Sequence, residues 1–161
     1  MKQIGKRFIL GLFIIYIAIL IYLLFYSRVD VMNFSALQTR ETLKEYACSG
    51  NLNIVPLHTI RLFVKGYIRH RVTGLSAFEN IIGNIIMFIP FGLSLPYFLT
   101  CFRSLIRTVL FGIAILLLIE TVQLVTQLGA FDVDDILLNL FGIIIGYGIW
   151  SKTIKIRRKA A

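Results

Sequence analysis

Polar side chains of the kinds that do chemistry lie inside or beside the apolar stretches of this chain. Glu120, Gln123 and Gln127 interrupt one such stretch. An acidic segment follows it, and Asn139 lies just inside the next apolar stretch. A central Asp in a membrane helix costs about 2.5 to 3.5 kcal/mol on insertion scales, so such residues mark candidate functional sites. We therefore expect these side chains to serve binding or catalysis.

Helical spacing gathers these side chains on shared faces. Glu120, Gln123 and Gln127 follow i, i+3 and i+7, and two further polar pairs are four residues apart in neighbouring stretches. At about 1.5 Å per residue, the three stripes occupy the same half of a membrane. Since a polar group facing lipid lacks a partner, we predict that the stripes face one another and form a polar pocket open to the outside. The predicted pocket residues are Asn80, Asn84, Glu120, Gln123, Gln127, Asp132, Asp134, Asp135 and Asn139.

The carboxylates leave two interpretations open. Asp132, Asp134 and Asp135 could hold Mg²⁺ against a phosphate. Glu120 would then act as an acid or base, which makes Glu120 and Asp135 the candidate catalytic residues. Alternatively, Asp132 or Asp134 caps the helix that follows, because Asp is strongly preferred at helix N-termini. The sequence has no Gly-rich phosphate loop, and we expect no cofactor.

The elements that must position these residues are membrane spans. The chain is 58% apolar, against about 45 to 50% in soluble domains. Several apolar segments approach the roughly 20 residues that cross a bilayer. We predict an all-α bundle of four transmembrane helices, forming a single domain over residues 1–161. The predicted spans are residues 8–26, 80–100, 108–128 and 136–151, with a loop at 27–79 and the first span retained as a signal anchor.

The positions of the cations predict the orientation. Lys and Arg concentrate before the first span, between the second and third, and after the fourth. The positive-inside rule then places both termini in the cytoplasm, and the loop and the acidic segment outside. On this topology a bilayer separates Cys48 from Cys101, so no disulfide joins them.

The loop contains a basic amphipathic segment. Between residues 58 and 70, apolar side chains recur at i, i+3, i+4, i+7 and i+8, while Arg61, Lys65 and Arg69 repeat every four residues. This pattern predicts a helix lying in the outer interface, with its cations toward anionic headgroups or wall polymers. The alternative is that its apolar face caps the bundle.

Glycines predict close packing and helix ends. Gly142 and Gly146 form a small-xxx-small pair, and Gly83 lies in the second span, so helices are expected to approach closely at these positions. Gly129 is expected to end the third helix.

The order of these motifs resembles the VanZ-like family of small bacterial membrane proteins. The resemblance covers about residues 50–150 and rests on four segments: Asn51-Leu-Asn53-Ile-Val-Pro56, then Asn80 to Gly92 with Asn84 and Pro90, then Glu120-Thr-Val-Gln123, then Asp132-Val-Asp-Asp135 with Asn139 and Gly142. Family members often carry an Arg shortly before the aspartates, where this chain has Gly129-Ala130-Phe131. The founding member is associated with low-level resistance to teicoplanin, a lipoglycopeptide that acts on cell-wall precursors outside the membrane.

The resemblance implies a multi-pass protein of the bacterial cell membrane with a role in antibiotic resistance. We expect a non-enzymatic protein that alters how a lipoglycopeptide or lipid-linked wall precursor engages the outer surface. Its loop residues Asn53, Pro56, Arg61, Lys65 and Arg69 would contribute to a binding face, with membrane lipids as further partners and no nucleic acid. An enzyme acting on a lipid-linked substrate through a carboxylate-bound metal is the first alternative, and a small transporter with Glu120 carrying a proton is the second.

Overall fold

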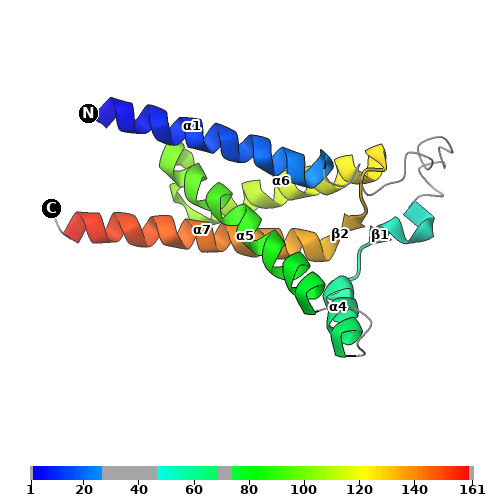
Figure 1. Ribbon diagram of the computed structural model, residues 1–161. Coiled ribbons are helices and arrows are strands. Elements are labelled where there is room, and N and C mark those ends of the chain that lie inside the picture. Colours follow the sequence, from blue (N-terminus) through cyan, green and yellow to red (C-terminus); the bar gives the residue numbers. More distant parts are fainter. Residues whose placement is uncertain (1, 27–46, 69–73, 160–161) are drawn as a thin grey trace.

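Four long apolar helices and a short helix between two of them make up the fold in the computed structural model (Figure 1). The structure describes residues 2–26, 47–68 and 74–159. The long helices are α1 (Lys2–Ile21), continued by the π-helical turn η1 (Tyr22–Tyr26), α5 (Gly74–Phe98), α6 (Leu105–Thr126) and α7 (Val133–Lys159). All four are long and apolar enough to cross a membrane, which confirms the predicted four-span, all-helical class.

The chain places its two described ends on the same side of the bundle. In Figure 1 the N-terminal end of α1 and the C-terminal end of α7 lie at the left. The connection between α5 and α6, which contains η3 (Thr100–Arg103), lies at the same end. The opposite end carries η2 (Ala47–Asn51), the short helix α4 (His58–Ile68) and the strands β1 (Leu52–Asn53) and β2 (Phe131–Asp132). We call this the loop end.

The centre of the bundle is the close pair of α5 and α7. A Cβ added at Gly142 would lie 2.1 Å from the Ile85 carbonyl oxygen, and one at Gly146 would lie 2.1 Å from the Ile89 carbonyl oxygen. Only glycine allows this approach, which agrees with the predicted small-xxx-small packing. Gly83 does not contribute, because nothing lies within 4 Å of its added Cβ. The pair therefore fixes α7, and with it the acidic segment, relative to α5.

The first helix, α1, contacts α5 through a hydrogen bond and an aromatic pair. The Tyr16 hydroxyl donates to the Met87 carbonyl at 2.9 Å, and the Phe13 ring lies 5.3 Å from the Phe98 ring between centroids. Most apolar side chains of α1 are exposed in the isolated chain. This exposure suits a helix that faces lipid over much of its surface.

Two predicted helix ends were wrong. The third helix ends at Thr126, where Gln127 adopts the left-handed conformation (φ 57°) and its N–H bonds back to Gln123 and Leu124, so Gly129 is not the terminator. The fourth helix starts at Val133 and runs to Lys159, earlier and longer than predicted. Its first turn accepts two aspartates because a helix N-terminus favours negative charge.

Candidate functional site

The acidic turn begins α7, and Asp132 caps that helix. The Asp134 N–H donates to Asp132 Oδ1 at 2.8 Å. This is the N-cap geometry, in which a side-chain oxygen satisfies the second free N–H of the helix. Of the two predicted capping residues, the structure therefore selects Asp132.

Asp132 also binds the segment that leads into α4. Its Oδ1 accepts a hydrogen bond from Asn53 Nδ2 at 2.9 Å, and its Oδ2 accepts one from the Thr59 hydroxyl at 2.6 Å. Asn53 Nδ2 lies 3.0 Å from Thr59 Oγ1 as well, which closes a three-residue ring. The backbones run together here, since β1 pairs in parallel with β2 and Asn53 lies opposite Asp132.

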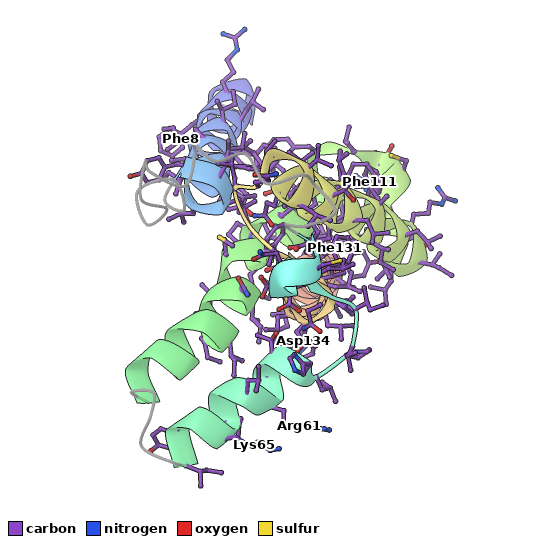
Figure 2. The ribbon with its side chains drawn as sticks, turned by 90° about the vertical axis from the view of Figure 1, so that its right-hand side faces the viewer. Phe8, Arg61, Lys65, Phe111, Phe131 and Asp134 are labelled. Atoms are coloured by element: carbon purple, nitrogen blue, oxygen red, sulfur yellow. The ribbon has the colours of Figure 1, made fainter. Side chains whose placement is uncertain are left out.

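Asp134 caps a second helix, far away in sequence. Its side chain is fully buried where α4 meets the bundle (Figure 2). One carboxylate oxygen accepts the Leu57 N–H and the other accepts the Ile60 N–H at 3.1 Å. The Arg61 N–H bonds to the Leu57 carbonyl, so Leu57 is the residue before the first turn of α4. Asp134 thus satisfies two free N–H groups of α4 in trans.

This cap holds a residue in an unfavourable backbone conformation. Leu57 has φ 64°, in the left-handed region, which costs an L-residue about 1 to 2 kcal/mol. The hydrogen bond from Leu57 to Asp134 offsets this cost and fixes the direction in which α4 leaves the bundle.

Glu120 supports the acidic turn from α6. Its side chain is buried, and Oε2 accepts the Asp132 N–H at 2.9 Å. An isolated carboxylate at this depth would be costly, and the backbone N–H is one partner that compensates it. Glu120 therefore contacts the turn rather than standing apart in an open pocket.

The remaining polar residues bridge other pairs of helices. Asn84 Nδ2 donates to Asp135 Oδ1 at 2.7 Å, which joins α5 to the first turn of α7. Gln123 Nε2 donates to the Leu24 carbonyl at 2.9 Å, which joins α6 to η1 at the end of α1. Each helix of the bundle is thus connected to a neighbour by a polar side chain from the predicted set.

Two buried amide oxygens have no hydrogen-bond partner among the described residues. They are Gln123 Oε1 and Asn139 Oδ1, on side chains that are 0% and 2% exposed. A buried acceptor without a donor costs about 1 to 3 kcal/mol. Among the predicted pocket residues, these two oxygens are the buried acceptors to which no described group donates a hydrogen bond.

The structure brings most of the predicted residues to the loop end, but it divides them among separate partners. Asp132, Asp134 and Glu120 lie around the turn and the start of α4, Asn84 pairs with Asp135, and Gln123 turns to η1. Asn53 joins the first group, while Pro56 is exposed in the connection to α4. The side chain of Asn80 and residue Arg69 lie outside the described residues.

The described carboxylates do not form a metal cage. Over residues 2–26, 47–68 and 74–159, no group of three or more His, Cys, Asp or Glu side chains is placed to hold a metal ion. Asp132 and Asp134 use both of their oxygens as hydrogen-bond acceptors, from Asn53, Thr59 and Asp134 in one case and from Leu57 and Ile60 in the other. These hydrogen bonds cap α7 and α4 and attach the loop to the bundle.

Sequence reasoning missed Thr59 and the backbone N–H groups of Leu57 and Ile60. A signal for them was present, because the amphipathic segment starts after Pro56-Leu57-His58, which offers no usual capping side chain. Its free N–H groups needed an acceptor from elsewhere, but no sequence pattern indicated which residue supplies it.

These features can be compared with known proteins. The family model of VanZ/LLP1 matches residues 13–155, most of the chain. The chain belongs to the VanZ/LLP1 family. No curated protein and no solved structure matches it. The match covers α4, α5, α6, the acidic turn, most of α7 and the part of α1 from residue 13 onward, so the residues at the loop end lie within the part that matches the VanZ/LLP1 family.

Proposed function

We propose that this protein is a non-enzymatic membrane protein that lowers sensitivity to teicoplanin-like lipoglycopeptides. It acts at the outer surface, by changing how the antibiotic or a lipid-linked wall precursor engages the membrane. Family membership supports the antibiotic class, and the cation distribution supports an outward-facing loop end. The polar cluster then has the task of presenting a fixed surface to that side.

One observation carries the proposal: Asp132 and Asp134 attach α4 to the bundle. Both oxygens of each carboxylate accept hydrogen bonds from the loop or from the start of a helix. Several donors on one carboxylate fix its position. We infer that these two carboxylates serve as scaffold, and α4 is the element they hold in place.

The test is the inhibitory concentration of teicoplanin for cells that express each variant at a matched membrane level. Wild type should raise it over an empty vector. Glu120→Gln and Asp135→Asn should keep protection, because an amide oxygen still accepts the hydrogen bonds from Asp132 N–H and Asn84. Asp134→Asn should lose most of it, because one amide oxygen cannot replace two acceptors and the amide NH₂ faces an N–H donor.

The alternatives predict the opposite pattern. A catalytic or proton-carrying Glu120 requires the ionisable group, so Glu120→Gln would abolish protection while the protein still inserts. Protection that depends on carboxylates at positions 120 and 135 would overturn the scaffold proposal. Wild type that gives no protection would overturn the antibiotic role. Calorimetric titration of the purified protein with Mg²⁺ or Mn²⁺ supplies an independent check on the metal-dependent alternative.

A further inference from the structure

Residues 52–68 form an exposed apolar surface that the bundle does not cover. On α4, Val64, Tyr67 and Ile68 are 46%, 57% and 68% exposed, so the alternative that this face caps the bundle is wrong for them. The connection before α4 adds Ile54 and Val55, at 64% and 59%. Large apolar side chains that are exposed together along one short segment mark an interaction site.

The position of this surface is fixed to the end of a membrane span. The candidate span of α7 runs from Val133 to Ile154, and Asp134, its second residue, binds the N–H groups of Leu57 and Ile60. The first turn of α4 therefore lies level with the first turn of a helix that crosses the membrane. In Figure 1, α4 runs crosswise to α7 at that level, as a helix lying in the membrane plane would.

Cations border the apolar residues. Arg61 and Lys65 are exposed and project from α4 on the side away from α5 (Figure 2). Long cationic side chains can extend from an apolar surface toward the phosphate level. An apolar face with a basic border suits an interfacial helix in a membrane that contains anionic lipid.

We propose that residues 52–68 are an in-plane anchor that binds anionic phospholipid in the leaflet at the loop end. The apolar side chains of the connection and α4 enter the acyl region, while Arg61 and Lys65 bind lipid phosphates. A soluble phosphate polymer would match the cations and leave Ile54, Val55, Tyr67 and Ile68 in water, so the lipid is the occupant that satisfies both parts. This proposal stands apart from the antibiotic role, because it concerns the protein's own seating in its membrane.

Depth measurements in nanodiscs test the anchor. With Cys48→Ser and Cys101→Ser in the full chain, single cysteines at Val64, Tyr67 and Lys65 receive an environment-sensitive fluorophore. In discs of phosphatidylglycerol and phosphatidylcholine, lipids with a shallow acyl nitroxide should quench the labels at 64 and 67 several-fold more than the label at 65. Iodide should quench the label at 65 more strongly. Labels at 64 and 67 that iodide quenches freely and nitroxide lipids do not would overturn the proposal.

The lipid charge is tested with matched variants. Arg61→Gln with Lys65→Gln should reduce nitroxide quenching at Val64 in phosphatidylglycerol discs to the level seen for wild type in pure phosphatidylcholine. Arg103→Gln with Arg107→Gln, which removes two exposed cations outside residues 52–68, should leave that quenching unchanged. If neither phosphatidylglycerol nor the Arg61→Gln, Lys65→Gln double substitution changes the quenching, the anionic-lipid assignment is overturned. Shielding of the labels by added polyglycerol phosphate, without any effect of phosphatidylglycerol, would assign the surface to a polymer instead.

Discussion

Buried polar residues in this protein act mainly through what they fix in place. Asp134 is the clearest case, because its two oxygens hold the N-terminus of a helix more than 70 residues earlier in the chain. Asp132 performs the local and the distant task together, since it caps α7 and binds Asn53 and Thr59. At this scale a charged side chain near a membrane span gains its stability from several N–H and O–H donors at once.

The buried Oδ1 atom of Asn139, which lacks a described donor, leads to a prediction about stability. Asn139→Leu keeps the branched shape and the number of side-chain heavy atoms and removes the Oδ1 atom that has no described partner. Because an unpaired buried acceptor costs about 1 to 3 kcal/mol, the variant should be as stable as wild type or more stable. The measurement is thermal unfolding in detergent. A clear loss of stability would mean that the oxygen has a donor in the native protein or that the two methyl groups of Leu do not fit the site.

Sequence reasoning succeeded at this scale where the pattern was local. The i, i+3 spacing placed Glu120 and Gln123 on one stripe, and both are buried. The preference for Asp at helix starts predicted Asp132 or Asp134 as the cap, and the structure has Asp132. The trans cap by Asp134 was not predictable from spacing, because it depends on how the loop returns to the bundle. No local pattern relates residue 134 to residue 57.

The helices differ in how sharply their sequences define them. The apolar runs predicted four spans, but Asp134 and Asp135 shifted the predicted start of α7 inward, because composition alone treats charge as the end of a span. In the structure, Asp134 and Asp135 lie in the first turn of α7, where the helix N-terminus favours negative charge. The end of α6 was missed for a related reason: Gln127, rather than a glycine, adopts the left-handed conformation.

The pairing of α5 with α7 predicts a strong asymmetry between two glycines of one helix. Gly142→Ala should destabilise the protein by about 1 to 3 kcal/mol, because its Cβ would lie 2.1 Å from the Ile85 carbonyl oxygen and the helices would have to separate. Gly148→Ala is the matched control, since nothing lies within 4 Å of its added Cβ. Thermal unfolding of both variants checks this. Equal stabilities would mean that α5 and α7 do not pack as described.

The molecule as a whole has two chemically different ends. The termini and the α5–α6 connection share one end, while α4, the β1–β2 pair and the acidic turn share the other. This arrangement agrees with an even number of spans. The charge pattern assigns the first end to the cytoplasm, and that assignment remains a prediction.

Thiol labelling tests the orientation. Cys48 and Cys101 are both exposed and free, and they belong to η2 and η3 at opposite ends of the bundle. A membrane-impermeant maleimide added to intact cells should modify Cys48 and spare Cys101, and permeabilised cells should show both modified. Modification of Cys101 alone in intact cells would reverse the orientation and place the loop end in the cytoplasm.

The central claim is that the acidic turn holds α4 in a fixed position on the bundle. Pulsed electron paramagnetic resonance in nanodiscs tests it, with spin labels at Leu62→Cys on α4 and Leu137→Cys on α7, both exposed positions, and the native cysteines replaced by serine. The labelled protein that keeps Asp134 should give one narrow distribution of the distance between the two labels. Asp134→Ala should broaden this distribution markedly, because the N–H groups of Leu57 and Ile60 lose their acceptor. Asp135→Asn, which can still accept from Asn84, should remain narrow. A distribution as narrow in Asp134→Ala as in the parent protein would contradict the claim.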